Sequence, residues 1–520
     1  MAAQSGLGER NVSGRDQAYI VETSIGGSAF FDYDNDGDID LYVVNGSSFH
    51  GFPEGEHPFN RLYRNDGGST FADVTAEAGV GDTTWSLGCV AADYDNDGSV
   101  DLFVANFGRN RLYRNLGNGR FEDVTERAGV GDEGYGTAGT FGDYDLDGDL
   151  DLYVSNYIEF SLDYKSTIPC VWKTYDIMCG PRGMIPQADI FYRNNGDGTF
   201  TDVTAEAGMA GSRYFGYQAV FVDFTEDGWP DLFVADDMTP NKLFINRGDG
   251  TFSDEALGSG VGFSADGAEQ GCMGVGVGDY DGDGHLDILV SNFEGQYNTL
   301  YRNEGDGYFL DVSYASKVAA MGGPEVGWGT ALFDYDNDGD KDIFVANGHT
   351  YHQADLPRAN ARYAQPNFLF ENLGDGTFRE VSQLAGPGLA IEAVSRGAVF
   401  GDYDDDGDID IFVLNLNGYP NLLRNDGGNG NNYLFIKTVG RRANRDGIGT
   451  RIEIEVSGRR QVAEVRSGSS YLGHDDMRAH FGLGQATLVD KVTLRWPGGT
   501  VQELRDVAVN QVLTVTEPDS

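Results

Sequence analysis

Short apolar runs separated by acidic, glycine-rich segments recur along most of the chain. The segment from Phe31 reads FDYDNDGDIDLYVVN, in which an Asp-rich turn is followed by the apolar run LYVV. Short apolar runs bounded by turn residues are typical of β-strands. Similar segments, seven in all, begin at Phe31, Ala92, Gly142, Val222, Gly278, Phe333 and Gly401. This self-similarity indicates a repeat architecture.

A second pattern lies between the acidic segments, as in NRLYRNDGGSTFADVTAEAG from Asn60. Apolar and aromatic residues alternate with polar ones around a Gly-rich turn, which predicts a β-hairpin. Complete copies begin at Asn60, Asn110, Asp189, Asn241, Asn298 and Asn367, and a seventh copy from Asn421 stops after NLLRN. Each complete unit therefore supplies four short strands, the content of one propeller blade. We expect an all-β protein with a seven-bladed β-propeller over residues 1–428.

The C-terminal part of the chain has a different character. Alternating runs such as Arg451–Val456 and the Gly turns between them predict a small antiparallel β-sandwich over residues 431–520. These residues hold 12 Lys+Arg and 11 Asp+Glu, whereas the rest of the chain holds the remaining 24 basic and 72 acidic residues. The change in charge indicates a domain boundary near the Gly- and Asn-rich segment 426–431.

Composition narrows the classes of partner. A formal net charge of −47 excludes nucleic acid, because phosphate contacts need clustered Lys and Arg. Cations are the natural partner. No apolar stretch is long enough for a transmembrane segment, and a signal peptide is missing from this chain.

The first residues suggest that the chain continues upstream. AAQSGL at residues 2–7 is similar to the TAEAGV that ends at Val80, but the F-x-D-V-T strand expected before it is missing. We expect that strand, and a secretion signal, to lie before Met1.

The acidic loops have the pattern D-x-D-x-D-G-x-x-D, with Asp at positions one, five and nine and Gly at position six in all seven. Ca²⁺ prefers six to eight oxygen ligands, and carboxylates at alternate positions of a tight loop can surround it. Position seven would contribute its backbone carbonyl. We expect six or seven bound Ca²⁺ ions. The predicted ligands are Asp32, Asp34, Asp36, Asp38, Asp40, Asp93, Asp95, Asp97, Ser99, Asp101, Asp143, Asp145, Asp147, Asp149, Asp151, Asp223, Thr225, Asp227, Trp229, Asp231, Asp279, Asp281, Asp283, His285, Asp287, Asp334, Asp336, Asp338, Asp340, Asp342, Asp402, Asp404, Asp406, Asp408 and Asp410.

Two other interpretations of these loops are weaker. An EF-hand requires a Glu at position twelve, where all seven loops carry Val. A plain Asp/Gly turn would explain one copy, but not seven copies with the same constrained positions. The fourth loop departs most, since Thr225 occupies position three.

Other motifs are less informative. Cys170 and Cys179 are candidates for a disulfide, with four free thiols as the alternative. His349 and His352 form an H-x-x-H that we attribute to packing or surface chemistry rather than to metal ligation. The run at Gly274, Gly276 and Gly278 indicates a tightly packed strand, and Arg441, Arg442 and Arg445 indicate a solvated turn or a contact with an acidic surface.

Three long insertions, at 46–59, 157–188 and 348–366, follow the strands after the first, third and sixth acidic loops. Because strands alternate in direction, they should lie opposite the acidic loops, where Trp172, His349 and Tyr351 could line a pocket. We expect an extracytoplasmic scaffold that binds a protein or carbohydrate ligand on this face. A Ca²⁺-dependent lyase or hydrolase and a purely structural assembly partner are the alternatives, and neither ligand identity nor oligomeric state follows from the sequence.

The acidic loops and the strands after them resemble the FG-GAP/VCBS-type repeats of integrin-α-like propellers, from about residue 27 to 428. Separately, NNYLFIKTVGRRANRDGIGTRIEIEV, RSGSSYLGHDDMRAHFGLG and VDKVTLRWPGGTVQEL resemble the ASPIC/UnbV domain of the cartilage acidic protein family. The resemblance implies a Ca²⁺-binding protein that is secreted, periplasmic or on the cell surface.

Overall fold

The computed structural model describes residues 2–14, 17–53, 56–67, 70–164, 168–211, 213–321, 323–427 and 430–519. Residues 428 and 429 at the predicted domain boundary, and the chain ends Met1 and Ser520, lie outside the described residues.

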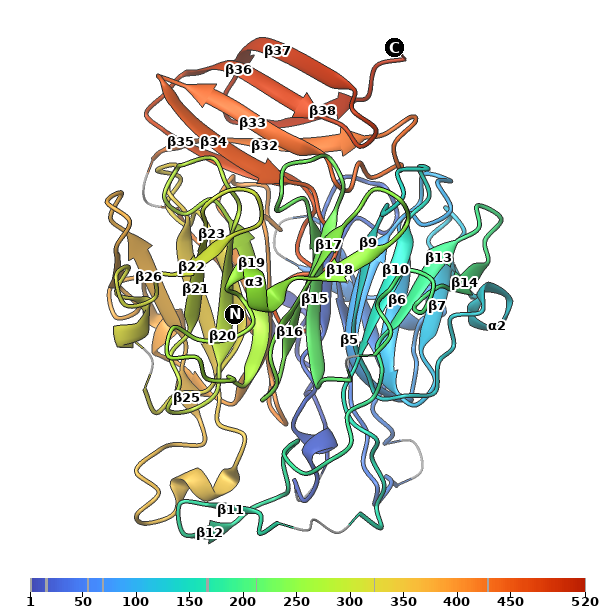
Figure 1. Ribbon diagram of the computed structural model, residues 1–520, viewed down its shortest axis with the longest axis vertical. Helices are drawn as coiled ribbons and strands as arrows, with labels where there is room; N and C mark the ends of the chain where they lie inside the picture. The colour runs from blue at the N-terminus through green and yellow to red at the C-terminus, as the bar shows by residue number, and fades with distance from the viewer. Residues whose placement is uncertain are drawn as a thin grey trace.

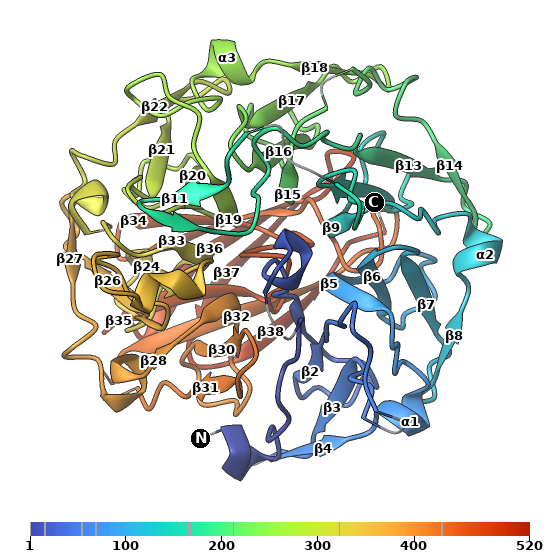
Figure 2. The same cartoon turned by 90° about the horizontal axis from the view of Figure 1, so that it is seen from below.

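Seven antiparallel sheets form a ring around a central axis (Figure 2). The first strand of each sheet contacts the first strands of both neighbouring sheets, and β29 contacts β1, so the ring is closed. Each sheet then steps outward in chain order. Blade one contains β1 (Ser28–Phe31), β2 (Asp40–Val43), β3 (Arg61–Asn65) and β4 (Phe71–Asp73); blade two contains β5 (Trp85–Ala92), β6 (Asp101–Phe107), β7 (Arg111–Asn115) and β8 (Phe121–Asp123); and blade three contains β9 (Gly136–Gly142), β10 (Asp151–Asn156), β13 (Ile190–Asn194) and β14 (Phe200–Asp202). Blade four contains β15 (Gly216–Val222), β16 (Asp231–Asp236), β17 (Lys242–Asn246) and β18 (Phe252–Asp254), and blade five contains β19 (Cys272–Gly278), β20 (Asp287–Asn292), β21 (Thr299–Asn303) and β22 (Phe309–Asp311). Blade six contains β23 (Gly327–Phe333), β24 (Asp342–Asn347), β26 (Phe368–Asn372) and β27 (Phe378–Glu380), and blade seven contains β29 (Ser395–Gly401), β30 (Asp410–Asn415) and β31 (Asn421–Leu423).

The innermost strands carry glycines where neighbouring backbones come closest. A Cβ atom at Gly397 would lie 1.8 Å from the carbonyl oxygen of Gly26, and one at Gly274 would lie 2.1 Å from that of Trp328. Only glycine permits this approach. The interpretation of the run at Gly274 as a tightly packed strand is therefore confirmed.

Blade seven has three strands among the described residues, and the N-terminal tail reaches from it to blade one. Short helices end the outer strands of other blades: α1 (Thr75–Ala78), α2 (Thr125–Ala128) and α3 (Ala256–Ser259). The tail, with η1 (Ala2–Ser5), takes the same place. Gly6 lies against the carbonyl of Phe71 in blade one. In the same way, Gly208, which follows blade three, lies against the carbonyl of Phe252 in blade four. The strand expected upstream of Met1 stays a prediction.

Residues 430–519, here called the C-terminal unit, lie on one end of the ring (Figure 1). They form one sheet of β35 (Ala479–Gly484), β32 (Asn432–Val439) and β38 (Val512–Thr516), and a second of β34 (Arg459–Glu464), β33 (Arg451–Val456), β36 (Leu488–Arg495) and β37 (Val501–Ala508). The predicted fold class, a seven-bladed propeller followed by a small β-sandwich, is confirmed. One detail differs from the expected antiparallel pattern, since β32 pairs with β38 in parallel.

The loop between β34 and β35, residues 465–478, enters the propeller axis and is here called the axial loop. Ser470 exchanges two backbone hydrogen bonds with Val275 of β19, at 2.7 and 2.9 Å. Tyr471 is fully buried, and its hydroxyl donates to the carbonyl of Ser24 at 2.9 Å. Ser24 follows η2 (Ile20–Glu22), which lies near the axis at the opposite end of the ring (Figure 2). Segments from both ends of the chain thus meet along the axis.

The end of the ring opposite the C-terminal unit carries the three insertions and is here called the insertion face (Figure 1). The remaining elements are the hairpin β11 (Val171–Trp172) and β12 (Tyr175–Asp176), the pair β25 (Gln365–Pro366) and β28 (Glu392–Ala393), and the 3-10 turns η3 (Val318–Met321), η4 (His352–Asp355) and η5 (Pro387–Ala390). In the part of the chain that the structure describes, no helix has the length and apolar character needed to cross a membrane.

Candidate metal centres

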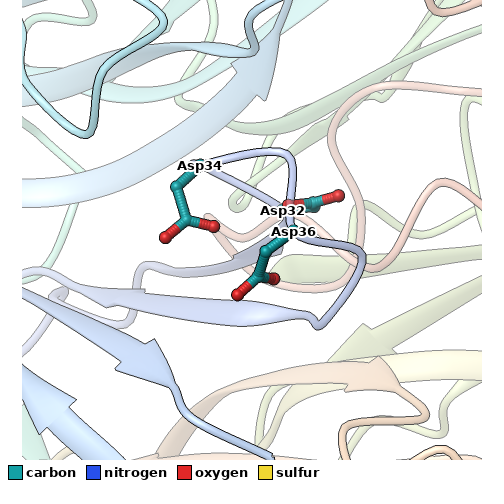
Figure 3. Close-up of side chains that lie close together, drawn as sticks. All are labelled: Asp32, Asp34 and Asp36. Carbon is teal, nitrogen blue, oxygen red and sulfur yellow. The ribbon is translucent and has the colours of Figure 1, made fainter.

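Each acidic loop joins the innermost strand of a blade to its second strand, so all seven lie on one end of the ring, here called the loop face. In the first loop, the side chains of Asp32, Asp34 and Asp36 converge (Figure 3). Among the described residues, at least five loops each bring three carboxylate oxygens within 4.8 Å of one another and could hold a metal ion. The groups are Asp32, Asp34 and Asp36; Asp93, Asp95 and Asp101; Asp143, Asp145 and Asp151; Asp279, Asp281 and Asp287; and Asp334, Asp336 and Asp342.

The second loop shows how the backbone turns. Asn96 at position four and Gly98 at position six have φ values of 58° and 91°, in the left-handed region that Asn and Gly tolerate best. This turn points the amide groups of Asp97 and Gly98 at Asp93, whose two carboxylate oxygens accept them at 3.0 and 2.7 Å. The backbone of the loop thereby orients the Asp at position one.

The Asp at position nine connects the loop to the blade. Asp101 begins β6, is fully buried, and accepts backbone N–H groups from Tyr94 at 3.2 Å and Asn115 at 2.7 Å. The equivalent pair of hydrogen bonds is present in all seven loops. Burial raises the pKa of Asp40 to about 8, despite these hydrogen bonds, and neighbouring carboxylates add to the shift.

In four of the loops, the Asp at position three has a carboxylate oxygen without a donor. One carboxylate oxygen of each of Asp34, Asp95, Asp145 and Asp336 is buried and has no hydrogen-bond partner among the described residues. A buried, unpaired carboxylate oxygen is costly, and a bound cation would satisfy it. Because the donors are all oxygens, the set suits a hard cation such as Ca²⁺.

Neighbouring negative charges add to the effect of burial on the pKa values in these loops. The pKa values of Asp93, Asp143 and Asp334 are raised to about 7, first by burial. Neighbouring carboxylates raise them further, including Asp147 beside Asp143. A divalent cation would relieve this repulsion.

The fourth loop differs as the sequence suggests. Thr225 replaces an Asp at position three and donates its hydroxyl to Asp223 at 3.4 Å. At position seven of the fifth loop, the His285 ring pairs with Glu226 of the fourth loop at 2.7 Å, so its side chain is used between loops. The predicted carbonyl ligands at position seven stay a prediction.

Sequence reasoning missed a set of asparagines that join the blades. Asn115, at the end of β7, donates its side-chain amide to the carbonyl of Tyr33 in the preceding blade at 2.8 Å and to that of Val100 at 2.9 Å. The Asn that recurs in all seven copies of this segment was the available signal. The equivalent residues are Asn65, Asn115, Asn194, Asn246, Asn303, Asn372 and Asn425.

Of the other candidates, Cys170 and Cys179 form a disulfide, while Cys89 and Cys272 are buried free thiols. His349 is fully buried, and its Nδ1 accepts the backbone N–H of Tyr351 at 2.9 Å, whereas His352 is exposed in η4. His349 thus packs in the interior, and His352 lies at the surface.

The sequence matches the FG-GAP-like repeat over residues 32–104, 93–154, 176–234, 223–290, 279–345 and 354–413, and ASPIC and UnbV over residues 440–520. Cartilage acidic protein 1 from Homo sapiens is 30% identical over 61% of this chain and 46% of its own length, and that from Mus musculus is 28% identical over 61% and 47%. The chain thus spans about half the length of these curated relatives.

Solved structures give more distant similarities. A lectin from Agrocybe aegerita, described as recognising non-reducing terminal N-acetylglucosamine, is 18% identical with a TM-score of 0.41, covering 72% of this chain and 86% of its own. Sqt1 from Saccharomyces cerevisiae is 9% identical with a TM-score of 0.42, covering 80% and 98%. Since the repeat matches together cover most of the sequence, the chain belongs to the family of FG-GAP-like repeat proteins.

Proposed function

We propose that this protein is an extracytoplasmic, Ca²⁺-loaded scaffold that binds a macromolecular ligand on its insertion face. The observation that carries the proposal is the separation of two kinds of site. Asp clusters with unpaired buried oxygens lie on the loop face, and the three long insertions lie on the opposite face. Ca²⁺ then has a structural role, and recognition is left to the insertions.

The metal side of the proposal rests on the chemistry of the donors. Each cluster supplies carboxylate oxygens held by backbone N–H groups, and burial has already removed part of their hydration. Ca²⁺ would neutralise them and bind the oxygens that have no donor. We propose six or seven ions per chain, with the fourth loop the weakest site because of Thr225.

The insertion face is built by contacts among the insertions. Phe49 in the insertion 46–59 stacks on Phe160 in the insertion 157–188, with ring centroids 5.5 Å apart. Lys173 in the insertion 157–188 donates to the carbonyl of Ala359 in the insertion 348–366. The neighbouring Trp172 donates to Glu294 at 2.7 Å. The insertions thus form one continuous surface.

Several apolar side chains of this surface face solvent. The exposed fractions of Leu162, Val171 and Ile185 are 53%, 50% and 56%. Exposed apolar groups on structured loops are typical of protein–protein contacts, so a protein ligand is favoured over a carbohydrate. The Cys170–Cys179 disulfide that staples this insertion suits an oxidising compartment.

The test shortens the stapled hairpin. Residues 170–179 are replaced by a Gly-Ser link, and the variant and wild type are screened against arrays of extracellular proteins and glycans, with Ca²⁺ and with EDTA. We expect the variant to lose the wild-type ligand while metal analysis finds the same number of Ca²⁺ ions and the melting temperature hardly changes, because surface loops hold few core contacts. Retained binding, or a ligand coordinated directly to an ion in an Asp loop, would contradict the proposal.

A further inference from the structure

The C-terminal unit is seated on the acidic loops themselves. Asp446 accepts the backbone N–H of Asp93 in the second loop at 2.7 Å, and Arg451 donates to the carbonyl of Gly284 in the fifth at 2.6 Å. The C-terminal unit also contacts the other five loops. Lys437 lies 3.6 Å from Asp32 of the first loop, the Arg442 carbonyl lies against Gly148 of the third, and Glu464 accepts the backbone N–H of Asp223 in the fourth. Asn431 donates to the carbonyl of Asp336 in the sixth loop, and Arg478 donates to that of Asp402 in the seventh.

Most of these contacts use backbone atoms of the loops. The position of the Asp93 amide or the Gly284 carbonyl depends on how the loop around it is folded. Without a cation, carboxylates within 4.8 Å of one another repel, and this repulsion favours an open loop. The surface that the C-terminal unit recognises is therefore the surface that an ion would fix.

Docking also places the axial loop. Its residues Ser470, Leu472 and His474 donate backbone N–H groups to Val275, Gln218 and Ser28, which belong to three different blades. These amides are buried along the axis and exchange with solvent only when the axial loop withdraws. The exchange rates of these amides therefore report whether the C-terminal unit is seated on the ring.

We propose that Ca²⁺ binding and the seating of the C-terminal unit are coupled, so that each strengthens the other. The inference rests on the proposed Ca²⁺ sites and adds Asp446 and Arg451 as positioning residues that act on the loops without being ligands. Linkage requires reciprocity: if an ion favours seating by a given factor, contacts of the seated unit favour the ion by the same factor.

The first experiment uses the full chain. Hydrogen exchange of the Ser470, Leu472 and His474 amides is followed as Ca²⁺ is titrated out with EDTA below the melting temperature, with metal analysis of the same samples. We expect exchange at these amides to rise at least fivefold as ions leave, while the amides of β33 and β36 stay protected. Loss of ions with unchanged exchange would overturn the coupling but leave the Ca²⁺ sites intact, whereas protein that holds no Ca²⁺ would refute the proposed function as well.

The second experiment measures Ca²⁺ affinity in variants and stays decisive even if EDTA unfolds the whole chain. We expect Arg451→Ala and Asp446→Ala to weaken Ca²⁺ binding about fivefold at the affected sites. Asp446→Asn, which keeps an acceptor for the Asp93 amide, should stay within about twofold of wild type, because the positioning contact is retained. Arg505→Ala is the matched control, since Arg505 is exposed on β37 and pairs only with Glu503 among the contacts described. Wild-type affinity in both alanine variants would overturn the proposal.

Discussion

A single buried carboxylate, such as Asp101, belongs at once to a candidate metal site and to a blade. Its two oxygens accept N–H groups from the start of its own loop and from the end of β7. Burial raises its pKa well above the ordinary value, because these hydrogen bonds do not fully replace hydration. The residue therefore has a structural role beside the metal-binding role that we propose for it, and a substitution tests both.

We expect Asp101→Ala to remove about one Ca²⁺ ion per chain and to lower the free energy of unfolding by about 2 to 4 kcal/mol, since two buried N–H groups lose their acceptor. Asp197→Ala is the control. Asp197 also accepts two hydrogen bonds, both from Thr199, but lies in an exposed hairpin turn. Metal analysis and denaturant unfolding measure the two effects, and an unchanged ion count would exclude Asp101 as a ligand.

His474 in the axial loop makes stability depend on pH. Burial alone lowers its pKa to about 3, and its Nδ1 accepts the N–H of Gly468 at 3.3 Å. The unfolded chain takes up this proton near pH 6.5, whereas the folded chain does not until about pH 3. Between these values the unfolded state binds more protons, so stability falls as the pH is lowered.

We expect wild type in saturating Ca²⁺ to lose about 2 kcal/mol more stability between pH 7.5 and 5.0 than His474→Asn, whose side-chain oxygen can accept the Gly468 amide. Asp475 titrates in the opposite sense, since burial raises its pKa to about 6, but it is common to both proteins and cancels in the comparison. Urea unfolding at the two pH values measures the difference. Parallel losses in the two proteins would show that His474 does not titrate as described.

At the level of elements, the blades are joined by an asparagine at the end of each third strand or, in blade seven, just after it. Asn194 donates to the carbonyl of Tyr94 in the preceding blade at 2.9 Å and to that of Leu150 at 3.1 Å. In the same way Asn65 of blade one reaches Tyr403 of blade seven at 2.7 Å, across the point where the ring closes. These bonds hold sheets that share no strand pairing.

We expect Asn194→Ala to lower the free energy of unfolding by about 2 to 4 kcal/mol, because two buried carbonyls lose their donor. The neighbouring Asn195→Ala provides the control, since Asn195 is exposed and bonds within its own hairpin. The Ca²⁺ count should be the same in both variants. Equal stability of the two variants would argue against the inter-blade role.

The elements that the sequence predicted are those that repeat and depend on local patterns. The seven Asp loops and the hairpins around G-D-G-T follow from residues within about 20 positions of one another. The axial loop could not be found in this way. It occurs once, has no alternation, and its partners are remote, as with Tyr471 and Ser24, which are 447 residues apart. The parallel pairing of β32 with β38 was missed for the same reason.

At the scale of the whole molecule, the proposed ion sites would add their effects on stability. A site with a Kd tenfold below the free Ca²⁺ concentration adds about 1.4 kcal/mol, and seven such sites together add about 10 kcal/mol. This is comparable to the stability of an ordinary domain. The C-terminal unit, which covers the loop face, would share in this gain.

We expect EDTA to lower the melting temperature by about 10 °C or more, because ions bind the folded loops and not the unfolded chain. Adding Ca²⁺ back should restore the melting temperature, and Mg²⁺ should restore much less of it, since Mg²⁺ demands a smaller octahedral site. Differential scanning calorimetry checks both. A melting curve that EDTA leaves unchanged would rule out structural Ca²⁺.

The meeting of Tyr471 with Ser24 along the axis also sets an order of events during synthesis. Ser24 leaves the ribosome long before Tyr471 does, and domains generally begin to fold as they emerge. Until residues 465–478 have been synthesised, the blades already made lack the segment that fills the axis. Aromatic side chains such as Tyr217 and Trp328, which pack on Tyr471 in the finished protein, then stay exposed to water. A chain that terminates early would keep this apolar surface exposed, where chaperones and proteases can recognise it. Filling of the axis thus marks a chain whose translation has passed residue 478.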